Sequence, residues 1–302
     1  MIHIKCPKCS VKFRRSKKCK HIIKKAGFYK RKSDRKSIQR YYCRQCRCGF
    51  SCATFARCYN QKKRHINSLT ERLLSAAVSL RESARILKVN RKTVVRKLIF
   101  IGTQAALDLS TFNKRLPKAT AITYDDLETF EHTKCKPVSV GLMVEEGTRR
   151  VLGFNVAKMP AKGLLAKISV KKYGKRIDER NQKRAELFRE TKSFVHDQAI
   201  IKSDECPYYL NHIKKYFPNA CHQTFKGRAS AIVGQGELKK VGFDPLFSIN
   251  HTCATFRYRA SRLVRRTWNT TKHVERLRLH LAIIALHHNR NLKTLLPLLD
   301  AR

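Results

Sequence analysis

The stretch Ala119-Thr-Ala-Ile-Thr-Tyr-Asp-Asp-Leu-Glu-Thr-Phe130 begins as an apolar run and then presents two adjacent acids, Asp125 and Asp126. Its first seven residues predict a β-strand. A second short apolar run, Ala199–Lys202, predicts another strand and leads to Asp204. Carboxylates at strand ends can meet at one edge of a sheet and hold hard divalent cations through oxygen. Asp125 and Asp204 are therefore candidate ligands of a metal that would act on phosphate.

Strand geometry limits which acid can take this role. Successive side chains of a strand point to opposite faces, so only one of Asp125 and Asp126 can point directly into the site. Asp126 and Glu128 are the alternatives to Asp125 as the metal ligand from this stretch. The competing interpretation is that these acids cap helices or pair with basic side chains.

The surrounding sequence predicts an α/β domain. Further strands are expected over Val138–Val144 and Val151–Val156, joined by a short hairpin loop. Residues 158–192 are expected to be mostly helical. Two more helices are expected over 249–268 and 274–289.

The N-terminal segment carries a cysteine pattern typical of zinc. Eight of the 12 cysteines lie in the first 58 residues, and two C-x-x-C pairs stand out among them: Cys6 with Cys9, and Cys43 with Cys46. Each pair can form a knuckle, and two knuckles complete a tetrahedral site. The sequence predicts a zinc ribbon over residues 1–66. Three alternatives stay open: Cys48 replaces Cys46, a second metal binds, or the cysteines carry none. Four cysteines have no assigned role: Cys19, Cys48, Cys52 and Cys58.

Residues 67–116 predict a helix-turn-helix module. Helices are expected over Ser68–Val78, Leu80–Leu87 and Arg91–Phe100, with a connector over 102–118. The third is the expected recognition helix. Its outward residues are expected to be Arg91, Lys92, Thr93, Arg96 and Lys97. A plain three-helix bundle with a solvated face is the alternative.

The charge favours a polyanionic partner. Lys and Arg total 67 against 21 acidic residues, a net charge of +46, which points to nucleic acid. The sequence shows no amphipathic basic helix or lipid anchor for a membrane surface. Its longest apolar run, Leu281–Leu286, is far below the roughly 18 residues that span a bilayer. No signal peptide is apparent at the N-terminus, so a cytoplasmic protein is expected.

Taken in order, these motifs resemble the transposases of bacterial insertion sequences, above all the insertion-sequence-one type. The resemblance rests on Asp125-Asp-Leu-Glu128, on Lys202-Ser-Asp204 and on the basic tract Asn250–Lys272, and it spans most of the chain. The basic tract is similar to the helix that closes the family's catalytic domain. It holds the further expected DNA-contacting residues Arg257, Arg262, Arg265, Arg266 and Lys272.

The resemblance implies a ribonuclease-H-like fold over residues 117–302 and a metal-dependent acidic triad. It places the first acid at Asp125 and the second at Asp204, with Mg²⁺ or Mn²⁺ between them. Where the family pattern has a glutamate, this sequence has Asn250, and a related group of transposases uses asparagine there. The rival third ligand is Glu237, on a glycine-flanked loop. Asn250 as a simple helix cap is the remaining interpretation.

The expected function is a multi-domain DNA transposase, with the ribbon and helices binding element ends and the α/β domain cutting and joining strands. Double-stranded DNA is the expected partner, bound by a homo-oligomer in the bacterial nucleoid. One alternative is a catalytically inactive DNA-binding protein derived from such an enzyme. Another is a nuclease without strand transfer.

Overall fold

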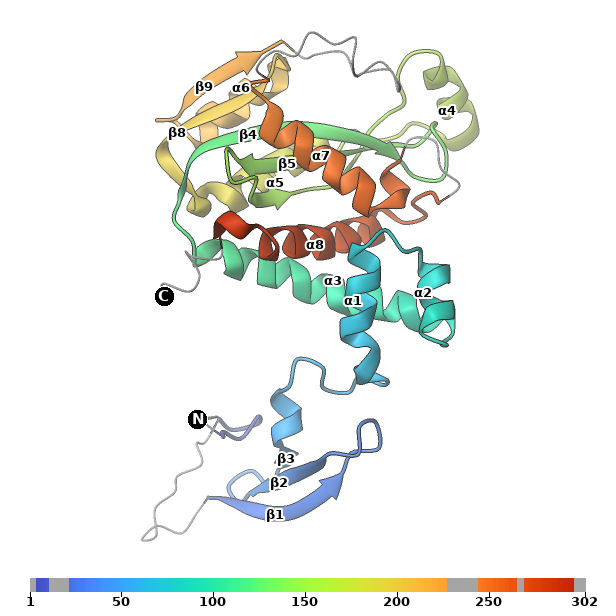
Figure 1. The fold of residues 1–302 in the computed structure, drawn as a ribbon, viewed down its shortest axis with the longest axis vertical. Coiled ribbons are helices and arrows are strands. Elements are labelled where there is room, and N and C mark those ends of the chain that lie inside the picture. Colours follow the sequence, from blue (N-terminus) through green and yellow to red (C-terminus); the bar gives the residue numbers. More distant parts are fainter. Residues whose placement is uncertain (1–3, 11–21, 227–243, 265–268, 296–302) are drawn as a thin grey trace. The chain divides into compact units, whose positions relative to one another are not determined.

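The computed structural model describes residues 4–10, 22–226, 244–264 and 269–295. The chain forms two compact units, Met1–Ser68 and Leu69–Arg302, whose elements are labelled in Figure 1. Its mixed α/β content is compatible with the predicted multi-domain α/β class.

The smaller unit is built on a three-stranded antiparallel sheet of β1 (Ile23–Lys30), β2 (Ser37–Cys43) and β3 (Gly49–Ser51). Tyr41 and Phe50 stack with ring centroids 5.6 Å apart, and Ile23 completes a small apolar core beside the cysteines. With so few apolar residues, this unit has little hydrophobic stabilisation of its own.

Three helices open the larger unit: α1 (Asn67–Ser75), α2 (Leu80–Ile86) and α3 (Arg91–Lys114). The side chains of Ser79 and Asn90 accept backbone N–H bonds at the starts of α2 and α3. The expected connector over 102–118 is wrong for most of its length, because α3 continues to Lys114. Gly102 lets α3 pack closely on the adjacent helix α8 (Val274–Arg290), since a Cβ there would lie 2.6 Å from the carbonyl oxygen of Leu279.

The larger unit centres on a mixed sheet in the order β6-β5-β4-β8-β9. β4 pairs antiparallel with β5 and parallel with β8, and β8 is also parallel to β9. The short β7 pairs with β5. The strand bounds are β4 Ala119–Phe130, β5 Pro137–Glu145, β6 Val151–Phe154, β7 Ala157–Lys158, β8 Val195–Asp204 and β9 Cys221–Phe225.

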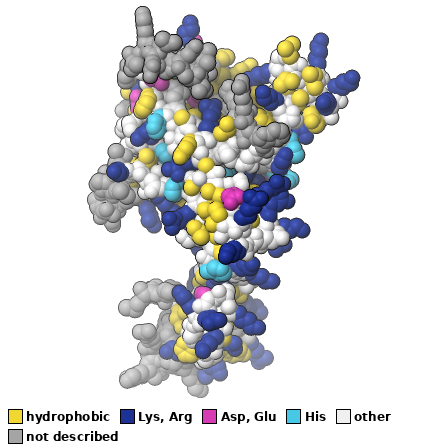
Figure 2. Space-filling model, turned by 45° about the vertical axis from the view of Figure 1, so that its right-hand side comes forward, with side chains coloured by type: hydrophobic (Ala, Val, Ile, Leu, Met, Phe, Trp, Pro, Cys, Tyr) yellow, Lys and Arg dark blue, Asp and Glu magenta, His cyan; other side chains and the backbone are white. Residues whose placement is uncertain are grey.

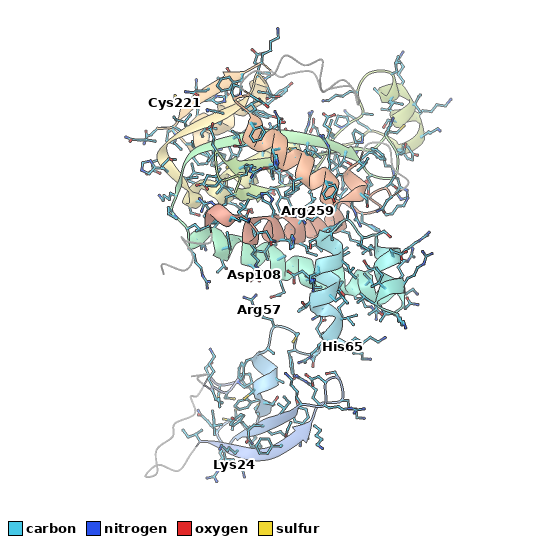
Figure 3. The ribbon with its side chains drawn as sticks, in the orientation of Figure 1. Lys24, Arg57, His65, Asp108, Cys221 and Arg259 are labelled. Carbon is cyan, nitrogen blue, oxygen red and sulfur yellow. The ribbon has the colours of Figure 1, made fainter. Side chains whose placement is uncertain are left out.

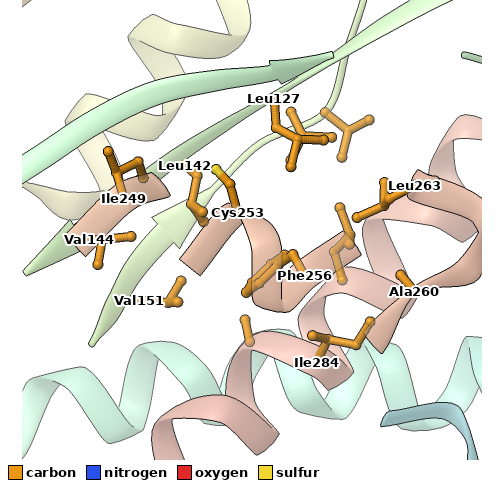
Figure 4. Packing of buried hydrophobic residues seen from close by; sticks show 14 of the residues in the cluster. Leu127, Leu142, Val144, Val151, Ile249, Cys253, Phe256, Ala260, Leu263 and Ile284 are labelled. Atoms are coloured by element: carbon orange, nitrogen blue, oxygen red, sulfur yellow. The ribbon is translucent and has the colours of Figure 1, made fainter. Parts of the chain in front are cut away.

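Helices cover both faces of this sheet, as Figure 1 shows. On one face, α5 (Arg180–Thr191) and α6 (Pro207–Tyr216) bury Ile122 and Tyr124 of β4. On the other, α7 (Phe247–Arg259) and α8 pack on β4 and β5 (Figure 4), and α3 packs against α8. The remaining helix is α4 (Leu165–Tyr173). Short 3₁₀ turns span Cys52–Phe55, Arg64–Ile66, Lys192–Phe194, Ser261–Leu263 and Lys293–Leu295.

The predicted single helix over 249–268 is wrong. α7 ends at Arg259 because Ala260 adopts an extended conformation, and a 3₁₀ turn follows. This turn lets both Ala260 and Leu263 reach the core without a continuous helix. Among the described helices, none is long and apolar enough to cross a membrane.

Candidate functional site

Asp125 lies on the face of the central strand that α7 covers. Its strand neighbour Leu127 and its cross-strand partner Leu142 belong to the apolar cluster beneath that helix. In Figure 4, Cys253 of α7 lies beside Leu142. Asp125 is therefore a partly exposed carboxylate at the margin of an apolar core.

Asp204 ends the neighbouring parallel strand on the same face. Asp125 and Asp204 directly follow Tyr124 and Ser203, the last paired residues of the two strands. Asp204 also pairs in register with Phe225, which packs against the cluster under α7. The structure therefore brings both acids to the same face of neighbouring strands, at the end of β8 but in the middle of β4. The strand end predicted at Asp125 is wrong, because β4 continues to Phe130 through its pairing with β5.

Both carboxylates are harder to ionise than ordinary aspartates. Burial raises the pKa of Asp125 to about 7, and the charge of Asp204 adds to the rise. Burial also raises the pKa of Asp204, and the charge of Asp126 adds to it. The backbone N–H of Asp126 donates to Asp125 at 2.7 Å, and that of Cys206 donates to Asp204 at 3.2 Å, which partly offsets the burial. Such a pair favours a bound cation, because neighbouring anions repel each other.

In the described part of the chain, neither Asp125 nor Asp204 forms an ion pair, whereas Asp126 does. The charges of Arg257 and Arg184 oppose the rise in the pKa of Asp125 and of Asp204, respectively, without forming such a pair. Carboxylate oxygens outside ion pairs fit a hard divalent cation such as Mg²⁺. The two acids could therefore hold such an ion.

Asp126, the alternative first acid, faces the opposite side of the sheet. Its carboxylate accepts from Arg184 at 2.8 Å, from Tyr209 at 3.2 Å and from Tyr124 at 3.1 Å. Gly141 makes room for this network, since a Cβ there would lie 2.6 Å from the Tyr124 hydroxyl. Strand alternation thus separates the two neighbouring acids, as the sequence predicts, and gives Asp126 a structural partner.

We expect Asp126→Asn to destabilise the larger unit by about 3 kcal/mol, because it leaves the nearly buried Arg184 without its counter-charge. Urea unfolding of the purified variant measures this. The matched control is Glu128→Gln on the same strand, which breaks an exposed pair with Lys162 and should cost less than about 1 kcal/mol. Equal losses in the two variants would refute a structural role for the Asp126 network.

The predicted third site residue, Asn250, is exposed. Asn250 lies in the first turn of α7, but the N-cap residue is Leu246, so the simple helix-cap interpretation is wrong. Its side-chain N–H donates to Asp244 at 3.0 Å. One and two turns further along the helix, Cys253 and Arg257 both interact electrostatically with Asp125. Asn250 thus begins the stripe of α7 that passes Asp125. Glu237, the rival ligand, lies outside the described residues.

Asp244 is the residue of this region that sequence reasoning missed. Its carboxylate accepts one hydrogen bond from the backbone N–H of Leu246 and one from the side-chain amide of Asn250, both at 3.0 Å. The sequence signal was present, because an acid two to three residues before a helix is a common N-terminal feature. Asp244 orients the Asn250 amide, so that its oxygen is the atom left to act as a ligand.

The four cysteines predicted from their spacing do converge. The Sγ atoms of Cys6, Cys9, Cys43 and Cys46 all lie within 4.8 Å of one another. The Sγ atoms of Cys6 and Cys46 are 3.3 Å apart, and those of Cys9 and Cys43 are 3.6 Å apart. Four sulfurs about 2.3 Å from one zinc ion would be about 3.8 Å apart. The group could therefore hold a metal such as zinc.

The pKa values of two of these thiols are shifted in opposite directions. Burial acts to raise the pKa of Cys6, but hydrogen bonds from the backbone of Cys9 and Lys8 and from the side chains of Cys46 and Cys9 together lower it to about 6. Burial raises the pKa of Cys46 to about 12. Cys48 is not in the group and instead lies against the carbonyl of Gly49. Cys19 lies outside the described residues.

The predicted DNA-contacting residues divide into exposed and buried ones. Arg91, Lys92 and Arg96 are exposed on α3 and Thr93 is partly exposed, as expected. Lys97 is a correction: only 4% of it is exposed, because it lies on the helix face of Val94 and Ile101. Figure 2 shows how far Lys and Arg side chains outnumber acidic ones on the visible surface.

The basic tract after α7 is similarly divided. Arg257 is partly exposed, Lys272 is exposed and Arg262 is buried, while Arg265 and Arg266 lie outside the described residues. Arg259, labelled in Figure 3, donates to the carbonyl of Ser75 and so ties α7 to α1. Part of this tract therefore serves the fold.

Within the ranges described, the four cysteines are the only group of three or more metal-ligating His, Cys, Asp or Glu residues. The carboxylate site is accordingly a pair rather than a completed triad. Comparison with known protein families and with curated proteins finds no match for this chain.

Proposed function

We propose that this protein is a DNA transposase whose catalytic metal is held by Asp125 and Asp204. One observation carries the proposal: two acids from distant parts of the sequence lie on neighbouring parallel strands, and neither forms an ion pair within the described chain. Structural acids in so basic a protein would be expected to pair with Lys or Arg, as Asp126 does.

The architecture supports a ribonuclease-H-like catalytic domain. β4, which carries Asp125, is central to a mixed sheet, and β8, which carries Asp204, is its parallel neighbour. Helices cover both faces, and Asn250 lies in the first turn of α7, which packs over the face that carries Asp125. In open sheets with parallel strands, ligands bind beyond the carboxyl ends of those strands.

The proposed roles follow from this placement. Mg²⁺ or Mn²⁺, when bound, would act as a Lewis acid on the scissile phosphate and its attacking oxygen. Asp125 and Asp204 would position that ion, and exposed cations such as Arg91 and Lys92 would hold the DNA backbone. The cysteine-containing unit, with zinc, and α2 and α3 would bind the element ends. We further propose a homo-oligomer on double-stranded DNA in the bacterial nucleoid.

The experiment is a cleavage assay with purified protein, Mg²⁺ and DNA carrying the sequences that flank the gene. Specific nicking at the element ends, followed by joining to target DNA, supports a transposase. Nicking without joining supports a nuclease. Replacing Mg²⁺ by EDTA should stop both steps.

The third ligand has its own test. We expect Asn250→Ala to reduce cleavage about a hundredfold or more, because it removes the amide oxygen from the metal site. Asn250→Asp should keep a substantial part of the activity, since it restores an oxygen ligand, and Glu237→Gln should have little effect. Rates of strand cleavage measure this. A fully active Asn250→Ala enzyme together with an inactive Glu237→Gln enzyme would instead make Glu237 the third ligand.

One observation favours a second candidate, a DNA-binding protein without catalytic activity. In the described ranges, Asp125 and Asp204 have no third carboxylate beside them. Such a protein would bind the same DNA with the same salt dependence but would release no cleaved product under any divalent cation.

A further inference from the structure

A basic cavity of about 660 Å³ lies in the larger unit, apart from the paired acids. It is bordered by the starts of α2 and α3 and by the chain that leads into α8. No acidic side chain is among its described lining residues. Six lining residues carry or can carry positive charge: Arg81, Arg91, Arg262, Lys272, His273 and Arg276.

Arg262 makes this cavity more than a patch of surface charge. Only 9% of the residue is exposed, and its Nε has no hydrogen-bond partner among the residues that the structure describes. Burial, together with the nearby charge of Arg276, lowers the pKa of Arg262 to about 10. A buried cation without a counter-charge is costly, so its presence at a cavity wall indicates a site for an anion.

The N-terminus of α8 also favours an anion in this cavity. His273 is the N-cap residue of this 17-residue helix, and its side chain makes no capping hydrogen bond, while the acidic Glu275 of the first turn is paired with Arg278. The first-turn N–H groups and the helix dipole therefore favour an anion beside His273 and Arg276, which both line the cavity.

We propose that this cavity binds phosphate groups of the DNA backbone and so fixes the path of DNA between α3 and the start of α8. The inference rests on the proposed function, because it takes DNA as the ligand. The positive charge of the cavity continues along α3, which favours DNA over a small anion. Arg91 lines the cavity, and Lys92 and Arg96 on the same helix are exposed. A duplex backbone would span these positions, whereas a single phosphate would not.

Two double variants with the same loss of charge test the proposal. Arg81→Gln with Arg276→Gln changes the cavity. The control, Arg85→Gln with Arg278→Gln, changes the same two helices at positions that do not line it. Affinity for a flanking-end duplex is measured by fluorescence anisotropy at several salt concentrations.

We expect the slope of log affinity against log salt to become less steep by about 2 in the cavity variant, since each lost phosphate contact removes about 0.9. The control should change it by less than half as much. Equal changes in the two variants, or none in the cavity variant, would overturn the proposal.

Inorganic phosphate is the second probe, added at constant ionic strength made up with chloride. If millimolar phosphate raises the Tm of the wild type but not of the cavity variant, while both bind duplex equally, the cavity holds a free phosphate and the DNA assignment is wrong. If the cavity variant alone loses duplex affinity, the backbone is the ligand.

Arg262→Met isolates the buried cation. We expect it to make the salt slope less steep by about 1 without lowering the Tm of the DNA-free protein, because it removes an uncompensated buried charge. A lower Tm with an unchanged slope would mean that Arg262 serves only the fold.

Cleavage by the wild-type protein, assayed in parallel, separates this proposal from the proposed function. If the wild-type protein cleaves DNA and the cavity variant binds DNA as well as the wild type, only the cavity proposal is wrong. If the cavity variant binds DNA more weakly and the wild-type protein does not cleave, only the proposed transposase activity is wrong.

Discussion

Asp125→Asn and Asp204→Asn should each reduce Mg²⁺-dependent cleavage about a thousandfold or more. Each change preserves the shape of the side chain and removes one of the two charges that hold the cation. A loss of several kcal/mol in transition-state stabilisation corresponds to that factor. Duplex affinity should not fall, because removing a negative charge from a basic protein does not weaken its attraction to phosphate. Strand cleavage and anisotropy on the same preparations separate the two effects.

Glu128→Gln is the matched control, since Glu128 lies on the same strand as Asp125 but pairs with Lys162 in an exposed position. It should cleave at the wild-type rate. Undiminished cleavage by Asp125→Asn would show that this carboxylate does not hold the metal. In that case Asp126 is the next candidate ligand. Because Asp126→Asn is also expected to destabilise the larger unit, its folding stability must be measured before its cleavage rate is interpreted.

The strand that carries Asp125 could be predicted from sequence because a local pattern decides it. The apolar run that starts at Ala119 predicts a strand, and the two-residue period separates Asp125 from Asp126. The strand does not end at these acids, because pairing with β5 carries β4 on to Phe130. That Asp125 and Asp204 become neighbours depends on the parallel pairing of β4 with β8. This pairing is a long-range contact that no local pattern encodes, although the resemblance to transposases implied it.

Other features were missed because tertiary packing overrides local signals. Lys97 looks like a surface residue by type, yet it lies on the helix face that packs inward. α3 is extended to Lys114 by its packing on α8, through residues such as Ile101 and Ala105. The end of α7 at Arg259 follows from the burial of Leu263, a contact made across the unit.

The cysteine group is predicted to be the main source of stability for the smaller unit. Cys43→Ser should abolish zinc binding and unfold Met1–Ser68, because structural zinc contributes on the order of 10 kcal/mol to folding in such units. The apolar core beside the cysteines is too small to replace it. Elemental analysis of reduced protein should find one zinc per chain in the wild type and none in the variant.

The larger unit should survive this change, because it has separate apolar clusters and its own sheet. Its thermal unfolding should shift by no more than about 2 °C, since no zinc ligand comes from it. Cys52→Ser is the control: Cys52 is exposed and outside the metal group, so zinc content and both transitions should be unchanged. If the Cys43→Ser protein instead keeps a folded smaller unit without metal, the four thiols lie together for a reason other than zinc. If it loses both units at once, the two do not fold independently.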